Sequence, residues 1–509
     1  MTKSGPAHYF RALDGQDMSG IDVVLNQLIP GLTECSNTGF VAYNHMQNDF
    51  FHYVLGKLAS SFAHIDPKKK GRAMCEIFGA YGWAEGTKIM KYLTDHMLVR
   101  GINYFVPHAF SPKPNDTDCP PNFYDTGNNP QYKFFKNTME YMNRMSHMLN
   151  DGVHISSCAI LYDAGSKWMN KGLLPMEQVA KVLYDHHLDY DIIPVDYLDQ
   201  IREGKLQGEN YNVLILPYVE HIPTEILHKL QNADIKVITV SEKEWNSGFE
   251  NVLLADLVDY LNGHYGCDVS TDYQGIYLRH YHYSRNDAQI YMFTNEGTYE
   301  TIETTVRLSA FSGGKYIAYD AFENKAVSCV SDTGEIRLSL PPYNSIVILC
   351  GDVSFEGVEE AKEMQLLSEK ELDLSYDITV ARSNSESFVP FKRASGLCNI
   401  TSAENLPDFS GHIRYDAEFE LESAKTLELD LGNVGEVAEL YINQKYVGSR
   451  QFPPYSFDIS QYVTAGKNRM RIIVSNHNGY ERRDCFSKFM LFEPSGLLGP
   501  VKMRELGEK

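Results

Sequence analysis

A glutamate stands inside an otherwise apolar segment of this chain. The segment reads Ala73-Met74-Cys75-Glu76-Ile77-Phe78, and two glycines and two large aromatics follow in Gly79-Ala80-Tyr81-Gly82-Trp83. A carboxylate in an apolar strand is costly unless it faces a polar cavity. Glycines allow a sharp turn there, and an aromatic ring can stack on a sugar. We therefore expect Glu76 to be catalytic and Tyr81 and Trp83 to contact a substrate, against the ordinary alternative of an ion-paired residue and core aromatics.

Two further strand ends carry polar side chains in the first 150 residues. Asn26 and Gln27 follow an apolar strand at 21–25, and His108 lies near the end of a strand at 102–110. In a parallel α/β barrel the functional groups come from the carboxyl ends of the strands and the loops after them. We expect Asn26, Gln27 and His108 to bind the same substrate as Glu76.

Hydrolysis of a glycosidic bond needs a second carboxyl group opposite the first. None of the other acidic candidates in the first 150 residues follows a strand end clearly, and Asp22 is expected near a strand start, which is the wrong end of a barrel. These candidates are Asp14, Asp17, Asp22, Glu34 and Glu85.

Two local patterns could hold a metal ion, but neither is specific. The run Asp185-His186-His187-Leu188-Asp189 falls at a helix end, where neighbouring side chains face different sides. Asp116, Asp118, Cys119 and Asp125 lie in a polar loop that could surround calcium. The strand at 159–162 is not followed by a glycine-rich dinucleotide motif. We therefore expect neither a metal nor a cofactor.

Strands and helices alternate along residues 1–150, which predicts a parallel sheet with helical crossovers. The expected strands are 21–25, 72–78 and 102–110; the expected helices are 50–63, 85–100 and 132–149.

The rest of the chain divides into four further segments. Residues 151–262 predict a small doubly wound α/β domain, with strands at 159–162, 213–217 and 236–240 and helices at 176–187 and 223–231. Residues 263–352 predict a small antiparallel β unit, 353–380 an acidic and partly helical linker, and 381–509 a β-sandwich. The expected fold class is thus α/β plus all-β and multidomain.

The composition excludes several classes of partner. The net charge of −21 argues against nucleic acid and anionic membranes, and no stretch approaches the roughly 20 apolar residues of a membrane span. The nine cysteines are widely spaced and form no CxxC pair, so we expect a reducing, cytoplasmic location.

Several segments together resemble large multidomain glycoside hydrolases. Cys75-Glu76-Ile77-Phe78-Gly79-Ala80-Tyr81-Gly82-Trp83 and Gly101-Ile102-Asn103-Tyr104-Phe105-Val106-Pro107-His108 resemble barrel strand ends of the family 106 α-L-rhamnosidase-like proteins. Residues 151–262 resemble the glutaminase-like domain of family 42 β-galactosidases. Gly411-His412-Ile413-Arg414-Tyr415, Leu440-Tyr441-Ile442-Asn443 and Pro494-Ser495-Gly496-Leu497-Leu498-Gly499 resemble the sugar-binding jelly roll of family 2 enzymes.

The resemblance implies a partial (β/α)8 barrel in which Glu76 ends the seventh strand and serves as general base or nucleophile. It implies hydrolysis of O-glycosidic bonds in a plant- or microbe-derived oligosaccharide. A whole barrel needs about 250 residues, so we expect the acid to lie upstream, in a missing N-terminal half, or the open edge to be covered in a homo-oligomer. The alternatives are a non-catalytic carbohydrate-binding protein and an inactive truncated glycosidase.

Overall fold

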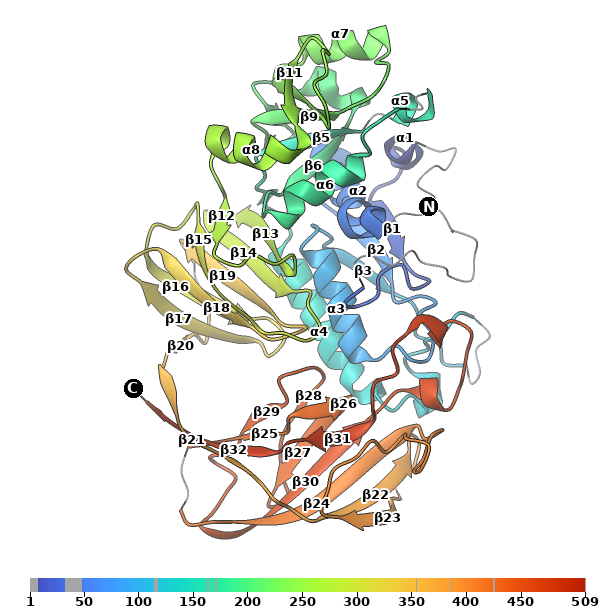
Figure 1. Ribbon diagram of the computed structural model, residues 1–509, viewed down its shortest axis with the longest axis vertical. Helices are drawn as coiled ribbons and strands as arrows, with labels where there is room; N and C mark the ends of the chain where they lie inside the picture. The colour runs from blue at the N-terminus through green and yellow to red at the C-terminus, as the bar shows by residue number, and fades with distance from the viewer. Residues whose placement is uncertain are drawn as a thin grey trace.

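The computed structural model describes residues 8–32, 48–113, 118–162, 164–169, 172–353, 355–385, 387–423 and 426–508. It is a mixed α/β and strand-rich multidomain protein. Figure 1 shows a helix-covered sheet in blue at the right, an α/β part in green at the top, paired β-sheets in yellow, and a second pair of β-sheets in orange and red at the bottom. Within the described part of the chain, no helix has the length and apolarity that crossing a bilayer requires.

The N-terminal part contains a parallel sheet in the order β1-β2-β3. Its strands are β1 (Ser19–Val23), β2 (Ala73–Ile77) and β3 (Tyr104–Pro107), and its helices are α1 (Tyr9–Leu13), α2 (Gly56–Ile65), α3 (Thr87–Leu98) and α4 (Tyr132–Met148). One face of the sheet buries Ile21, Cys75 and Ile77 in the same core as Leu58 of α2 and Leu93 of α3. On the opposite face, Gly20, Met74 and Glu76 are half-buried and Asp22 and Val106 are exposed. The three predicted strands and three predicted helices are thus present within a few residues of the expected bounds, and the helix expected at 50–63 begins as a π-helical segment, Phe50–Leu55, that continues into α2.

The green part is a five-stranded parallel sheet in the order β11-β10-β9-β5-β6. This order, with the first strand beside the second and third, is found in doubly wound folds. The strands are β5 (Cys158–Tyr162), β6 (Tyr190–Pro194), β9 (Val213–Pro217), β10 (Lys236–Ser241) and β11 (Glu250–Leu253); the helices are α5 (Ala164–Met169), α6 (Met176–Asp185), α7 (Thr224–Asn232) and α8 (Leu257–Tyr265). A two-stranded hairpin of β7 (Lys205–Leu206) and β8 (Glu209–Asn210) projects from this part.

Two antiparallel sheets follow and enclose a shared core that includes Leu278, Phe293 and Ile336. The smaller contains β12 (Val269–Thr271), β15 (Ile302–Leu308) and β18 (Glu335–Leu340). The larger has the order β20-β17-β16-β19-β14-β13-β4 and contains β13 (Leu278–Arg285), β14 (Ala288–Asn295), β16 (Gly314–Asp320), β17 (Lys325–Ser331) and β19 (Ser345–Gly351). The short strand β20 (Glu359–Glu360) at its edge pairs parallel with β17. The last strand of this sheet, β4 (Val153–His154), comes from much earlier in the chain.

Helices α3 and α4 connect the parallel sheet to the larger antiparallel sheet. Leu98 at the end of α3 and Tyr141 and Met145 of α4 pack with Tyr281 of β13 and Val347 of β19. Figure 1 shows the two helices running between the blue and yellow sheets. The N-terminal part is therefore braced from its helical side.

The C-terminal part is a sandwich of a four-stranded and a six-stranded sheet around one core. The strands are β21 (Met364–Glu371), β22 (Tyr376–Arg382), β23 (Val389–Ala394), β24 (Gly411–Leu421), β25 (Leu427–Asp430), β27 (Val437–Ile442), β28 (Lys445–Arg450), β29 (Ser456–Asp458), β30 (Gly466–Ser475) and β32 (Lys502–Glu508), with a small pair of β26 (Asn433–Gly435) and β31 (Gly496–Gly499).

The prediction of a partly helical linker at 353–380 is wrong. Residues Met364–Glu371 form β21, which pairs antiparallel with β32 through most of its length, and Glu359–Glu360 form β20. Of the glutamates that suggested a solvated linker, Glu369 lies on the exposed strand β21, where Lys502 and Arg504 of β32 pair with it at 2.7 and 2.8 Å. The sandwich therefore begins before residue 381.

Candidate functional site

Two carboxylates stand side by side at the carboxyl end of the parallel sheet. Asp22 of β1 pairs in register with Glu76 of β2, which pairs in turn with Val106 of β3. Residues paired in register across parallel strands lie on one face, with backbones about 4.8 Å apart. Asp22 is exposed, Glu76 is half-buried and Val106 is 50% exposed, so this row borders solvent.

The position of Asp22 corrects an expectation from the sequence. Asp22 is the fourth of the five residues in β1 and therefore lies at its carboxyl end, whereas we expected it near a strand start. The strand begins earlier than the apolar run Ile21–Leu25 suggests because Ser19 and Gly20 already pair with Ala73 and Met74. Asp22 thus joins Glu76 as a candidate functional residue.

The loops after β1 and β2 hold an unusual backbone. Leu25 and Asn26 have φ angles of 58° and 55°, and Phe78 and Ala80 have φ angles of 81° and 59°. Positive φ is strained for residues other than glycine, at about 1–3 kcal/mol each, and such strain gathers at functional sites. We call the carboxyl ends of β1, β2 and β3 and the loops that follow them the rim. Four strained residues beside Asp22 and Glu76 support a functional role for this rim.

The expected polar residues lie around the rim, with mixed exposure. The Asn26 side chain is buried and its Nδ2 donates to the Phe486 carbonyl at 3.0 Å. The Gln27 Oε1 accepts from the Val24 backbone N–H at 3.3 Å. His108 Nε2 lies 3.4 Å from an Asp118 carboxylate oxygen. Gln27 and His108 are partly exposed at the same rim as Glu76, whereas Asn26 supports the rim from inside.

The two aromatics after β2 have different surroundings. Tyr81 is fully buried, and its hydroxyl donates to the Leu28 carbonyl at 3.0 Å. Tyr81 is therefore corrected from a substrate-binding to a core residue. Trp83 is partly exposed, but the Arg482 guanidinium lies 4.3 Å from the centre of its ring. One face of the Trp83 ring is therefore already covered by a cation.

A segment of the C-terminal sandwich closes this side of the rim. The Trp83 backbone N–H donates to Asp484 at 3.0 Å and the Ala84 N–H donates to the Ser487 hydroxyl at 3.0 Å. A side chain at Gly82 would meet Ser487 at 2.3 Å, which explains the glycine there. Sequence reasoning missed Asp484 and Ser487 because they lie about 400 residues from the loop that they hold.

Glu85 is a buried carboxyl group without a partner. It is 2% exposed, and neither of its carboxyl oxygens has a hydrogen-bond partner among the described residues. Burial raises its pKa well above the ordinary value, so the neutral acid is favoured. Of the other acidic candidates, Asp14 pairs with Lys68 and Glu34 lies outside the described residues.

The two local metal patterns do not converge on one point. Asp185 pairs with Arg279 and Asp189 with Lys57, while the His186 ring bonds the Val182 carbonyl. In the calcium-like loop, Asp125 pairs with Arg482 and Asp118 lies near His108. Asp116 falls outside the described residues. The described carboxylates of both patterns thus already have basic partners.

Comparison with known proteins shows which proteins this chain resembles. The profile of glycoside hydrolase family 106, described as α-L-rhamnosidase, matches residues 42–244, which include Glu76 and the whole second strand. The chain therefore resembles the family 106 enzymes over somewhat less than half of its length.

Two individual proteins show the same likeness. A rhamnosidase from Novosphingobium sp. PP1Y has a similar fold, with a TM-score of 0.64 and 17% identity over 89% of this chain and 50% of that one. A Formosa agariphila protein named "putative beta-glucuronidase" is 28% identical over 187 residues, or 35% of this chain and 15% of that protein. This chain thus spans half or less of the length of these relatives.

Proposed function

We propose that this chain is a glycoside hydrolase, or a portion of one, that cleaves O-glycosidic bonds in an oligosaccharide of plant or microbial origin. The observation that supports this activity most directly is that Asp22 and Glu76 lie side by side at the carboxyl ends of parallel strands. The match to the family 106 profile and the fold likeness to a rhamnosidase support the same activity.

In this proposal the parallel sheet is a segment of a (β/α)8 barrel. The exposed face with Asp22, Glu76 and Val106 would be the barrel interior, and the buried face packs on the helices as the outer side of a barrel does. The domains would be 1–150, 151–262 and 263–352, followed by a jelly roll that starts with the strand at 364 rather than at 381.

Glu76 would act as general base or nucleophile, as expected from the sequence, and Asp22 as its companion carboxylate. Carboxyl groups about 5–5.5 Å apart suit a retaining reaction and about 6.5–9.5 Å an inverting one. Neighbouring parallel strands place the two backbones about 4.8 Å apart, and the side-chain rotamers then set the carboxyl separation. His108 and Gln27 would contact the sugar hydroxyls, while Asn26 holds the loop.

The test is hydrolysis of aryl glycosides by the purified chain, with α-L-rhamnoside, β-D-glucuronide and β-D-galactoside in the panel. If one is cleaved, Glu76→Gln should lower kcat by about 10²–10⁴-fold, the contribution of a positioned acid or base. Asp17→Asn is the matched control, since Asp17 is an exposed carboxylate just before the opposite end of the strand that carries Asp22. Full activity in Glu76→Gln, or an equal loss in Asp17→Asn, would refute the assignment.

A second candidate is sugar binding without turnover. The observation that favours it is the solvent exposure of Asp22 and Val106, because a complete barrel would enclose that row. Calorimetric titration with the same glycosides separates the two functions, since binding without cleavage supports the second candidate.

We also propose that a homo-oligomer covers the row of Asp22, Glu76 and Val106. Sedimentation velocity tests this oligomeric state. A reducing compartment also remains a proposal; the eight described cysteines are all free thiols.

A further inference from the structure

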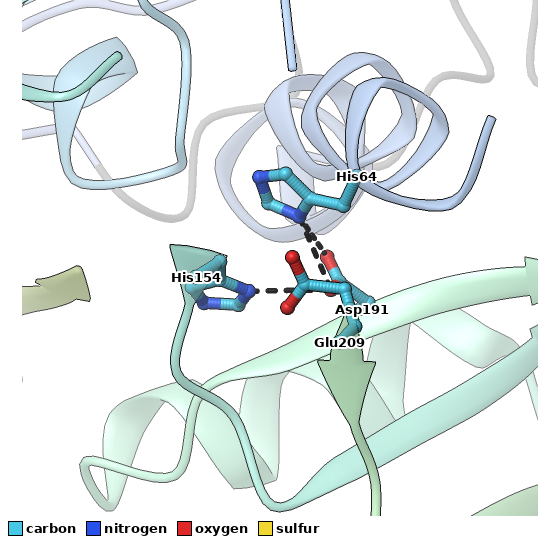
Figure 2. A group of neighbouring side chains, drawn as sticks. All are labelled: His64, His154, Asp191 and Glu209. Atoms are coloured by element: carbon cyan, nitrogen blue, oxygen red, sulfur yellow. Dashed lines mark hydrogen bonds and ion pairs between the residues drawn. The ribbon is translucent and has the colours of Figure 1, made fainter. Parts of the chain in front are cut away.

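Four potential metal ligands converge away from the strand-end rim. His64 comes from α2, His154 from β4, Asp191 from β6 and Glu209 from β8, and one ligand atom of each lies within 4.8 Å of all the others. Figure 2 shows the two imidazole rings approaching the carboxylates from separate elements. His154, Asp191 and Glu209 are buried, and the His64 side chain is 7% exposed. The cluster therefore lies where three parts of the chain meet.

The spacing of the ligand atoms is close to that of a four-coordinate metal site. His64 Nδ1 lies 3.0 and 3.1 Å from the two Asp191 oxygens, and His154 Nδ1 lies 3.2 Å from Asp191 Oδ2. Zinc bonds of about 2.0–2.2 Å in tetrahedral geometry put neighbouring ligand atoms roughly 3.3–3.6 Å apart. For these pairs of atoms, a movement of a few tenths of an ångström would give the spacing of zinc ligands, and a ligand atom of Glu209 lies within 4.8 Å of the others.

Glu209 gives independent evidence for a missing partner. It is 4% exposed, and its Oε2 has no hydrogen-bond partner among the described residues. Leaving a buried carboxylate oxygen without a donor costs several times the gain from an ordinary hydrogen bond. A cation between Glu209 and Asp191 would remove that cost.

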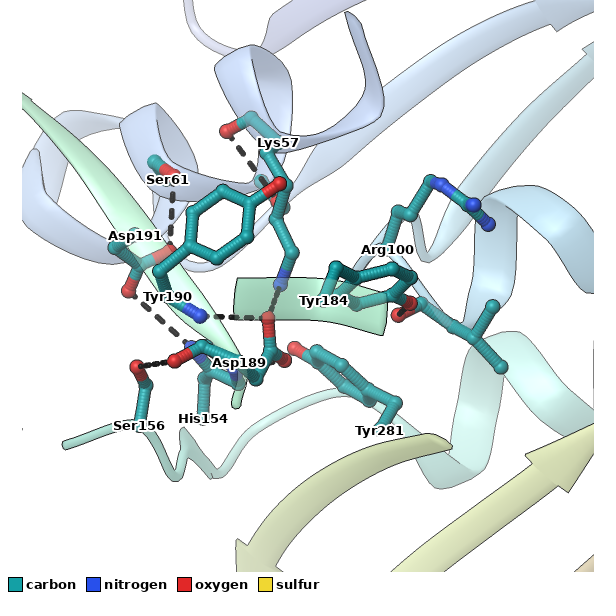
Figure 3. A network of polar contacts seen from close by, with 12 residues as sticks. Lys57, Ser61, Arg100, His154, Ser156, Tyr184, Asp189, Tyr190, Asp191 and Tyr281 are labelled. Carbon is teal, nitrogen blue, oxygen red and sulfur yellow. Dashed lines mark hydrogen bonds and ion pairs between the residues drawn. The ribbon is translucent and has the colours of Figure 1, made fainter. Parts of the chain in front are cut away.

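A second layer of contacts orients the ligands, as Figure 3 shows in part. His154 Nε2 bonds Asp189 at 2.8 Å, and Asp189 is paired with the buried Lys57. Asp191 also accepts from the Ser61 hydroxyl at 2.9 Å and from the Tyr211 hydroxyl at 2.8 Å. Metal-binding histidines commonly have their outer nitrogen on a carboxylate, and metal-binding carboxylates are themselves hydrogen-bonded.

The charges balance around a divalent ion. Asp191 and Glu209 contribute two negative charges, and the outer pair of Asp189 and Lys57 is neutral by itself. With both histidines neutral, one M²⁺ brings this buried cluster to zero net charge. Buried charges are tolerated in proteins when they are paired or bind a metal.

We propose that His64, His154, Asp191 and Glu209 bind a divalent transition metal of the zinc class. Two imidazole nitrogens and two carboxylate oxygens suit Zn²⁺, whereas calcium and magnesium prefer oxygen ligands alone. Four protein ligands leave no position for a substrate, so the ion is structural and clasps α2, β4 and the five-stranded sheet together. This role is independent of the glycosidase proposal.

Metal content of the whole chain tests the proposal directly. After equilibration with zinc and dialysis, elemental analysis should find about one zinc per chain, as for a structural site with four protein ligands. Binding in His64→Gln and Glu209→Gln should be at least about 10-fold weaker, and in Tyr211→Phe about 10–100-fold weaker, the usual effect of an outer contact. Co²⁺ in place of zinc should give the visible absorption of a four-coordinate site.

The matched control is Asp268→Asn. Asp268 forms another His–carboxylate pair, with His282 Nδ1 at 3.0 Å, but among the described residues it belongs to no group of three or more converging metal ligands. Zinc content should be unchanged in that variant. A proton shared by His154 and Asp191 is the alternative occupant of the cluster. Wild-type protein that binds no zinc and whose Tm is unaffected by a chelator would establish the proton and overturn the metal site, even if the cluster variants fail to fold. A loss of zinc in Asp268→Asn equal to that in the cluster variants would also overturn the assignment of the metal site to this cluster.

Discussion

The strand-end row and the buried His–carboxylate cluster use the same kinds of side chain in opposite settings. Asp22 and Glu76 border solvent on an uncovered sheet face, whereas Asp191 accepts hydrogen bonds from Ser61 and Tyr211 and contacts both His64 and His154. Solvated carboxylates can meet a ligand at little cost to the fold, but buried ones are bound to their neighbours. The row therefore has the features of a site for chemistry, and the cluster those of a structural junction.

The largest effect should come from breaking the outer pair of the cluster. Lys57→Met removes the lysine partner of Asp189, and both side chains are almost fully buried. We expect a loss of about 3–5 kcal/mol in the free energy of unfolding, because the buried Asp189 carboxylate keeps its contact with His154 but loses its permanent counter-charge. Urea unfolding measures it. Lys68→Met is the control, since Lys68 and Asp14 form an exposed pair worth about 0–1 kcal/mol. Similar losses of unfolding free energy in Lys57→Met and Lys68→Met would show that the buried cluster is no more important to stability than an exposed ion pair.

The second-largest loss of stability should come from breaking the contact between Arg482 of the C-terminal sandwich and the loops after β2 and β3. Arg482 pairs with the buried Asp125 at 2.5 Å and covers Trp83. Because Arg482 is partly exposed, we expect Arg482→Gln to cost about 1–3 kcal/mol, less than a fully buried pair. Arg382→Gln should cost about 0–1 kcal/mol, since its pair with Glu481 is half exposed on both sides. Thermal unfolding of the two variants compares them.

Glu85 should make stability depend on pH in an unusual direction. Burial raises its folded pKa above the unfolded value, so the folded state holds the proton more tightly. Its contribution is present in acid and is lost as the pH rises from about 4.3, the ordinary pKa of a glutamate, through the raised folded pKa. Glu85→Gln should remove this loss and raise stability by about 1 kcal/mol or more at pH 8, because a buried charge without a partner is costly. Urea midpoints at pH 5 and pH 8 test it; an unchanged pH slope would refute it.

The smallest effects belong to the uncovered row. Val106→Thr should change the free energy of unfolding by no more than about 0.5 kcal/mol, as exposed substitutions usually do, and the isosteric Glu76→Gln at the half-buried position should change it by less than about 1 kcal/mol. For Glu76→Gln this holds together with the loss of activity proposed above. A stability loss above 2 kcal/mol at Val106 would mean that another surface covers the row in solution, and would blur the difference between the two regions.

Local sequence patterns predicted the elements well and the long-range contacts poorly. The apolar spacing of residues 176–187 and 223–231 predicts helices that are observed at Met176–Asp185 and Thr224–Asn232. The prediction of a linker around Met364–Glu371 was wrong. A strand whose side chains all lie in solvent shows no apolar alternation, so its sequence does not indicate a strand.

The candidate sites illustrate the same limit. Glu76 could be found because a charge in an apolar strand is a local anomaly. Asp22 could not, because its role depends on the register between β1 and β2. The ligands His64, His154, Asp191 and Glu209 come from four separate elements, so no short motif contains them. Of the run 185–189, Asp189 contacts the proposed site, through the outer nitrogen of His154, and none of the four proposed ligands lies in the run.

The origin of the four ligands also limits how such a chain could be rearranged during evolution. A genetic exchange of the five-stranded sheet and its hairpin would transfer Asp191 and Glu209 but leave His64 on α2 and His154 on β4 behind. The recipient would inherit two buried acids without their basic neighbours. Homologues should therefore keep the segment from α2 to the hairpin as one hereditary block, whereas the sandwich, which contributes none of these four residues, is freer to be replaced.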